Sequence, residues 1–253
     1  MTRTYGAIII GDEIMRGKRQ DKHLAKLIEI LGARGLHLSW AQYLGDERPR
    51  LVETLRRTLA SGDVVFSCGG IGVTPDDHTR QAAAAAANVP LELNPDAERE
   101  IRARMAEMGQ DVTPARLGLG TVPRGSRIIP NPFNRIPGFS YQDHHFLPGF
   151  PQMAWPMAEW VLDRYYADDF RPGAETEAAI LVWDGLEGVM LDLMRQTEAD
   201  FPGLTVFSLP SFGSETLRRH VELGVRGAPE MVAQAIEVLK AGVTALGYRY
   251  DSK

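Results

Sequence analysis

Chemically useful residues are concentrated in residues 68–87, which read CGGIGVTPDDHTRQAAAAAA. Three glycines, Gly69, Gly70 and Gly72, follow a short apolar run and precede two adjacent acids. A glycine-rich turn between a strand and a helix leaves backbone N–H groups unobstructed by side chains, and such groups bind phosphate and other oxyanions. The stretch therefore predicts an anion site with carboxylates beside it.

The two acids, Asp76 and Asp77, allow two interpretations. Thr74 and Pro75 directly before them form a typical helix start, with Thr74 as N-cap and Pro75 at the first helical position. In that case the acids complement the partial positive charge of the helix end, which contributes about 0.3–1 kcal/mol. In the alternative, the carboxylates take part in chemistry at the anion site. The stretch by itself leaves both interpretations open.

The composition is that of an ordinary globular protein, with 253 residues, 44% hydrophobic and 24% charged. A net charge of -5 provides no basic field, so we expect no nucleic-acid partner. No stretch approaches the roughly 18 consecutive apolar residues of a membrane-spanning helix, so we expect no membrane association. A single cysteine, Cys68, and an N-terminus unlike a signal peptide favour a cytoplasmic protein.

Hydrophobic patterns predict an α/β fold for the first part of the chain. Three strand–helix units alternate over the first 90 residues, and helical spacing returns at 96–108 and 153–166. This alternation predicts three layers, a mainly parallel sheet flanked by helices. The strand candidates lie at 5–11, 36–45, 63–70, 126–130, 138–142 and 144–149.

A charged segment with Pro172 and Gly173, ADDFRPGAETE, reads as a linker between two domains. The segments after it predict the order β-α-β-β-α, which suits a small α+β domain. We therefore expect an α/β domain at 1–168 and a second domain at 175–253.

The string GGIGVTPDDHTRQA resembles the signature of the molybdopterin-binding domain family, which includes MogA, MoaB and the N-terminal domain of the competence-damage protein CinA. Three further blocks match in the family's order, and the likeness is greatest to the CinA type. These blocks are IIIGDEIMRGK at 8–18, NPFNRIPGF at 131–139 and FLPGFPQM at 146–153. The resemblance covers roughly the first 165 residues and implies a MogA/MoaB-like fold.

The resemblance also implies roles for individual residues. Molybdopterin or an adenine nucleotide is the implied ligand, and the implied catalytic residues are Asp77 and Asp76. Both acids, together with Glu13, are implied to hold a divalent metal. Mg²⁺ is the metal that suits this site, because it commonly joins carboxylates to substrate phosphates. The implied ligand contacts are Gly11, Glu13, Gly69, Gly70, Gly72, Thr74, Asn131, Pro148 and Gly149.

Two functions follow from the resemblance. One is a metal-dependent pyrophosphatase acting on substrates like ADP-ribose or FAD. The alternative is a non-catalytic oligomeric binding or regulatory module related to molybdenum cofactor proteins. A homo-oligomer, dimer or trimer, is implied in both cases. The sequence departs from the CinA type at 18–23, where KRQDKH replaces an asparagine-rich motif that contacts the ligand's ring.

Three other features are less informative. His144 and His145 are adjacent on a strand candidate, so their side chains point to opposite faces and make a poor metal chelate. Cys68 is expected to pack in a buried strand. The aromatic residues around Trp155 and Trp160 are expected to complete a core or an oligomer interface.

Overall fold

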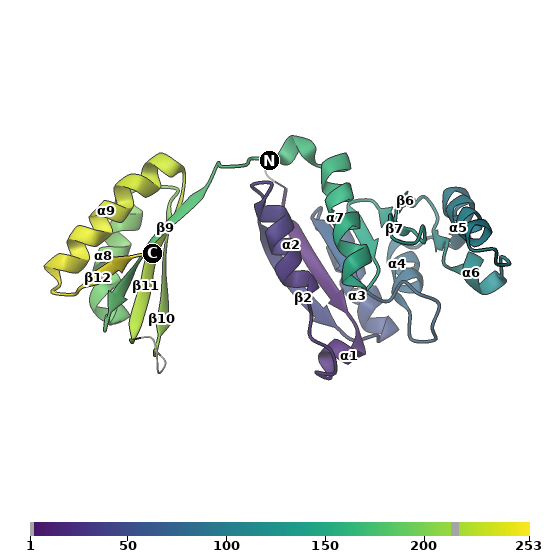
Figure 1. The fold of residues 1–253 in the computed structure, drawn as a ribbon, viewed down its shortest axis with the longest axis horizontal. Helices are drawn as coiled ribbons and strands as arrows, with labels where there is room; N and C mark the ends of the chain where they lie inside the picture. Colours follow the sequence, from purple (N-terminus) through teal and green to yellow (C-terminus); the bar gives the residue numbers. More distant parts are fainter. Residues whose placement is uncertain (1–2, 214–217) are drawn as a thin grey trace. The chain divides into compact units, whose positions relative to one another are not determined.

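The computed structural model describes residues 3–213 and 218–253. The chain folds into two compact units, Met1–Phe170 and Arg171–Lys253, and each unit has its own hydrophobic core (Figure 1). Within the described residues, no helix has both the length and the apolar character needed to cross a bilayer.

The first unit is built on a six-stranded sheet of order β2-β1-β3-β8-β7-β6. The four strands β2, β1, β3 and β8 run parallel to one another. β7 pairs antiparallel with β8, and β6 pairs antiparallel with β7. The predicted mainly parallel sheet is therefore confirmed. The strands are β1 (Tyr5–Ile10), β2 (Leu38–Leu44), β3 (Val64–Cys68), β6 (Arg127–Ile129), β7 (Gly138–Tyr141) and β8 (His144–Leu147).

Helices cover both faces of this sheet. On one face α2 (His23–Gly32) and α7 (Pro151–Tyr165) share a core with Ala7 and Ile9 of β1. On the other face α3 (Arg48–Leu59) and α4 (Thr79–Ala87) pack with the intervening side chains of β1. Because successive side chains of a strand point to opposite faces, a strand covered twice must be apolar throughout. This requirement explains the fully buried sequence YGAIII.

The start of α4 corrects one prediction. The expected N-cap was Thr74, but the helix begins at Thr79, with His78 as the N-cap residue. Thr74 and Asp77 instead close a separate turn, in which the Asp77 N–H donates to the Thr74 carbonyl at 3.0 Å and the Asp77 carboxylate accepts the Thr74 N–H at 2.8 Å. The acids therefore precede the helix, because the Asp77 side chain closes this turn before the helix starts.

Two short strands that the sequence patterns did not predict complete the first unit, together with further helical segments, of which α5 (Pro95–Glu107) corresponds to the helix expected at 96–108. A two-stranded sheet pairs β4 (Leu91–Leu93) with β5 (Thr121–Pro123). These strands escaped prediction because three residues are too few for a periodic pattern. The helices of this unit not named above are α1 (Asp12–Met15), α6 (Pro114–Gly118) and the 3₁₀ turn η1 (Ala167–Asp169).

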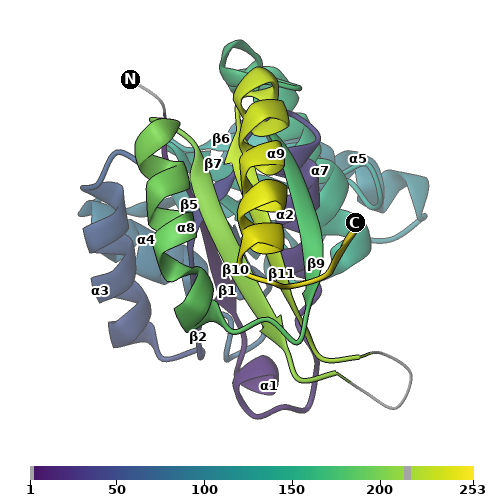
Figure 2. The same ribbon diagram turned by 90° about the vertical axis from the view of Figure 1, so that its left-hand side faces the viewer.

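The second unit is an antiparallel sheet of order β10-β11-β9-β12 with two helices. Figure 2 shows α8 and α9 side by side on one face of the strands. The order β-α-β-β-α matches the prediction, and a short final strand that pairs with β9 was missed. The elements are β9 (Thr176–Trp183), α8 (Glu187–Asp200), β10 (Thr205–Ser211), β11 (His220–Gly227), α9 (Pro229–Ala245) and β12 (Tyr250–Ser252).

We expect a fragment ending at residue 170 to fold by itself, because the first unit contains both cores that cover its sheet. Thermal unfolding of this fragment, followed by circular dichroism, should show one cooperative transition. A broad, non-cooperative transition would mean that residues 171–253 complete the core, and that 1–168 is not an independent domain.

Candidate functional site

A cavity of about 710 Å³ opens where the parallel strands of the first unit end. Its walls include Gly11 after β1, Gly69 after β3 and Pro148 after β8. The carboxyl edge of a parallel sheet is the usual ligand site of α/β folds. Every residue that the sequence analysis named as a ligand, metal or catalytic residue lines this cavity: Gly11, Glu13, Gly69, Gly70, Gly72, Thr74, Asp76, Asp77, Asn131, Pro148 and Gly149.

The carbonyl groups of the glycine loop, residues 69–73, are bound to the first turn of α4. The Gly69 carbonyl accepts from the Thr79 hydroxyl at 3.0 Å, and the Gly70 carbonyl accepts from the Thr79 N–H at 3.0 Å. The Gly72 carbonyl accepts from the guanidinium of Arg80. Three peptide planes of the loop are thus fixed with their carbonyls toward the helix.

The N–H groups of the same loop are left free. In a trans peptide the C=O and N–H bonds point in opposite directions, so these peptides direct their N–H groups away from α4. No group in the described part of the chain accepts a hydrogen bond from the N–H groups of Gly70, Ile71, Gly72 and Val73. All four residues line the cavity. Successive free N–H groups form a concave site for an anion.

Only glycine fits at two positions of this loop. Gly69 and Gly70 have φ values of +112° and +68°, in the region that other residues adopt at a cost. A Cβ on Gly70 would overlap the Thr79 hydroxyl, and a Cβ on Gly69 would overlap the carbonyl of Ile10. The close approach of loop, strand and helix therefore requires these two glycines.

Asp46 is a cavity residue that the sequence analysis missed. It follows β2, and its carboxylate accepts the Asp12 N–H at 2.8 Å while its own N–H donates to the Asp12 carboxylate at 3.2 Å. Burial raises the pKa of the Asp46 carboxyl, and the carboxylates of Asp12, Glu13 and Asp76 raise it further. Its position directly after a predicted strand, at the sheet edge that carries the glycine loop, was the available signal.

The cavity combines a loop of free N–H groups with excess negative charge. Four acidic residues line it together with two basic residues, and Arg19 lies 3.8 Å from Glu13. A bound phosphate would therefore meet both free N–H donors and nearby carboxylates. The acidic residues are Glu13, Asp46, Asp76 and Asp77, and the basic ones are Lys18 and Arg19.

The donor set fits Mg²⁺ in one specific way. Within the described residues, no three side chains of His, Cys, Asp or Glu gather closely enough to hold a metal ion by themselves. Mg²⁺, however, usually keeps several waters and takes one or two carboxylates together with substrate phosphates. The crowded carboxylates around Asp46 suit a cation that arrives with a phosphate.

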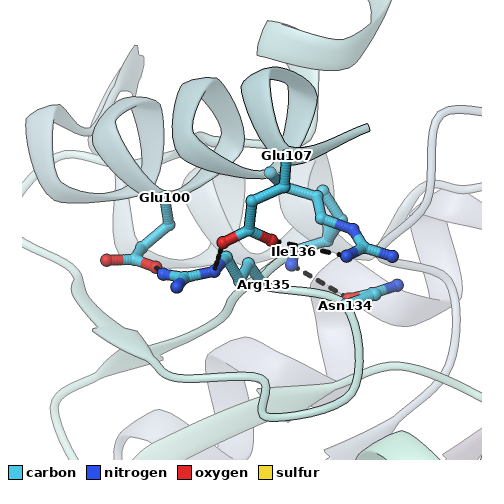
Figure 3. A network of polar contacts seen from close by, with 6 residues as sticks. Glu100, Glu107, Asn134, Arg135 and Ile136 are labelled. Atoms are coloured by element: carbon cyan, nitrogen blue, oxygen red, sulfur yellow. Dashed lines mark hydrogen bonds and ion pairs between the residues drawn. The ribbon is translucent and has the colours of Figure 1, made fainter. Parts of the chain in front are cut away.

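The 131–137 loop forms another part of the cavity wall and is fastened to α5 by ion pairs. Arg135 lies 3.0 Å from Glu100 and 2.8 Å from Glu107, both on α5 (Figure 3). Within the loop, the Asn134 side chain accepts the Ile136 N–H at 2.9 Å. Asn134 and Ile136 both line the cavity, so these contacts fix the shape of its wall.

A second cavity of about 470 Å³ shares part of its wall with the larger one. It is lined by residues 19–23, the segment that departs from the CinA type, and by Trp155. The His23 Nε2 donates to the Gly149 carbonyl at 3.1 Å, and in a neutral ring Nδ1 is then an acceptor. This Nδ1 and the Trp155 Nε1 are buried without a hydrogen-bond partner in the described residues.

The histidine pair and the cysteine lie within the core. His144 Nε2 lies 2.9 Å from the Thr58 hydroxyl, and His145 lies between Ser140 and Tyr166 at 2.8 and 2.7 Å. Burial lowers the pKa of His144 to about 4 and that of His145 to about 3. Cys68 is fully buried in β3, and burial raises the pKa of its thiol. The two aromatic residues named from the sequence, Trp155 and Trp160, pack against the first core.

We expect Gly70→Ala to destabilise the protein more than Gly109→Ala. Gly109 has a similar φ of +63° and no heavy atom within 4 Å of an added Cβ, so it shows the backbone cost alone, about 1–2 kcal/mol. Overlap with Thr79 adds about 1–3 kcal/mol at Gly70. Urea denaturation of both variants measures the difference. Equal losses would show that the loop moves away from α4 without cost.

We expect the unfolding free energy of Asp46→Asn, minus that of wild type, to increase as pH rises. A raised pKa means that the folded protein holds the proton more tightly than the unfolded chain. Wild-type stability therefore falls as pH rises from the ordinary aspartate pKa through the raised value, whereas Asn stays neutral and still accepts the Asp12 N–H. Unfolding free energies at pH 3 and pH 7 measure this, with the exposed Asp111→Asn as control. A difference independent of pH would contradict it.

Comparison with known proteins identifies the family of the first unit, which contains this cavity. A model described as a probable molybdopterin binding domain matches residues 6–167. A CinA-like protein of Anaeromyxobacter sp. is 34% identical over 162 residues, covering 62% of this chain and 40% of that protein. A protein of Pyrobaculum arsenaticum is 28% identical over 248 residues, covering 92% of this chain and 94% of that protein.

The solved structure of a CinA protein from Thermoplasma acidophilum, whose function is given as unknown, has the same fold. It aligns with a TM-score of 0.58 at 24% identity and covers 67% of this chain and 100% of that one. This chain spans about 40% of the length of the CinA-like relatives that it matches, such as those of Anaeromyxobacter sp. and Syntrophotalea carbinolica. Because the family model covers residues 6–167, well over half of the sequence, the chain belongs to the family of probable molybdopterin binding domains.

Proposed function

We propose that the chain binds a pterin or nucleotide through its phosphate groups, in the cavity at the ends of β1, β3 and β8. The four free N–H groups of the glycine loop carry this proposal, because they lack protein acceptors among the described residues and those of Gly70, Ile71 and Val73 are directed away from α4. A cavity of about 710 Å³ lies within the usual size range of small-molecule sites, about 300–1,000 Å³.

The second cavity suits the ring of such a ligand. It adjoins the glycine-loop cavity through shared wall residues, among them Gly149 and Phe150. His23 and Trp155 line this cavity, and the His23 Nδ1 and Trp155 Nε1 lie beneath its surface without protein partners in the described residues. A ligand with its phosphate on the loop would place its ring beside these two side chains.

A divalent cation, Mg²⁺ by its preference for oxygen, belongs to the proposal. Asp77, with Asp76 or Glu13, would hold it together with the ligand's phosphates. When bound, Mg²⁺ supplies positive charge that neutralises the phosphates and activates water. This charge would also relieve the repulsion among the carboxylates that line the cavity.

In its catalytic form the site is a pyrophosphatase for substrates such as ADP-ribose or FAD. Water adds to one phosphorus, the bridging P–O bond breaks, and the departing phosphate takes the bond's electron pair. The free N–H groups of the loop would stabilise the charge that develops on the phosphate oxygens. Asp77 and Asp76 would orient the water and accept its proton.

The alternative is a binding or regulatory module without catalysis, and one contact favours it. The Asp77 carboxylate already accepts both the N–H and the hydroxyl of Thr74, which gives it a structural role in its turn. Among the described residues, no histidine lines the larger cavity to act as a general base. For either function we propose a homo-oligomer, dimer or trimer, as the resemblance to the family implies.

We expect Asp77→Asn to remove the metal-dependent part of ligand binding and any turnover. Asparagine can still accept the Thr74 N–H, so stability should fall by less than about 1 kcal/mol. The measurement is the rise in melting temperature caused by ADP-ribose, FAD or pyrophosphate, with and without Mg²⁺, beside a hydrolysis assay of the same compounds. Ligand at 100 times its Kd should stabilise wild type by about 2.7 kcal/mol.

The variant Asp111→Asn is the control, because it removes one exposed acid of the same unit that does not line the cavity. Binding by wild type without hydrolysis would select the non-catalytic module. If Asp77→Asn lowers the melting temperature by several degrees and leaves Mg²⁺-dependent binding and turnover intact, the carboxylate only closes the Thr74 turn. In that case its proposed role with metal is wrong.

A further inference from the structure

Arg80, the second residue of α4, is a buried cation behind the glycine loop. Its side chain is 5% exposed, and its guanidinium donates to the carbonyls of Gly72 and Gly118. The third nitrogen, Nε, is buried without a partner in the described residues. The guanidinium therefore contacts the glycine loop from the side opposite to its free N–H groups.

No carboxylate in the described part of the chain forms an ion pair with Arg80, and Asp77 is the acid whose charge acts on it. Burial lowers the pKa of the guanidinium. Arg135 shows the usual arrangement, because this more exposed arginine has two carboxylate partners, Glu100 and Glu107 (Figure 3). Burying a charge without an opposite charge is strongly unfavourable, and buried charges in proteins are normally paired.

The contact with Gly72 also links Arg80 to one of the free donors. The Gly72 carbonyl and the Val73 N–H belong to the same peptide unit. A hydrogen bond from a cation to the carbonyl polarises this unit and makes its N–H a stronger donor. The Val73 N–H has no acceptor among the described residues, and Val73 lines the cavity.

We propose that Arg80 provides the positive charge for the bound anion, acting through the Gly72–Val73 peptide rather than by direct contact. Its missing partner is then a di- or oligophosphate seated on the glycine loop. The same charge would help the loop to hold a phosphate despite the carboxylates that line the cavity. Arg80 is thus a positioning and charge-supplying residue, and this role rests on the phosphate site proposed above.

The test compares Arg80→Gln with Arg80→Lys, and inorganic pyrophosphate is the probe. Gln keeps a hydrogen-bond donor and loses the charge, whereas Lys keeps the charge and loses the fork that reaches two carbonyls. Calorimetric titration at fixed Mg²⁺ should show pyrophosphate affinity reduced about ten-fold or more for Gln, with a smaller loss for Lys. Arg102→Gln, exposed and paired with Glu98, is the control and should bind like wild type.

A second ligand separates charge from support of the loop. If the charge matters, the loss in Arg80→Gln is larger for pyrophosphate than for orthophosphate, which carries less charge. Equal losses for both ligands, or equal losses in the Gln and Lys variants, would show that Arg80 only braces the loop, and would overturn the proposal. Wild type failing to bind pyrophosphate would overturn the phosphate site itself. Binding by wild type and unchanged binding by Gln would overturn the role of Arg80 alone.

A measurement on the wild-type protein covers the case in which Arg80→Gln does not fold. The Nε–H of Arg80, identified in a nitrogen-15 spectrum by its absence in Arg80→Lys, should shift when pyrophosphate binds. The Nε–H of the exposed Arg102 should stay in place. An unchanged Arg80 signal at saturating pyrophosphate would contradict the proposal.

Discussion

The candidate site depends on one set of contacts, the hydrogen bonds from Thr79 and Arg80 to the carbonyls of the glycine loop. They fix three peptide planes, and the planarity of the peptide then determines where the N–H groups point. They also require the start of α4 to lie against the end of β3. The alanines of α4 permit this, because Ala82 and Ala83 are buried in the core shared with α3.

Electrostatic balance is the second property of the cavity. Its N–H donors would attract an anion, while the carboxylates around Asp46 would repel one, and those of Asp12, Glu13 and Asp76 raise the pKa of Asp46. Such a site favours a ligand that brings its own cation, because the cation separates phosphate from carboxylate. The buried charge of Arg80 contributes attraction from within the protein, where water screens it less than at the surface.

The walls of the cavity are held by local bonds as well as by the core. Asn131 accepts the Phe133 N–H at 3.0 Å and donates to the Ile136 carbonyl at 2.9 Å, so the 131–137 loop supports itself. The ion pairs of Arg135 fasten this loop to α5. A loop with its own hydrogen bonds loses little conformational freedom when a ligand binds, which favours affinity.

The sequence by itself determined the alternating strands and helices and the glycine turn after β3, because these follow from local periodicity and from a continuous motif. The cavity residues outside that motif were implied by the resemblance of three further blocks to the family. Tertiary structure decided the rest. α4 begins at Thr79 because Asp77 closes a turn with Thr74. Asp46 and Arg80 reach the site through contacts with residues distant in sequence, Asp12 and Gly118, which no local pattern encodes.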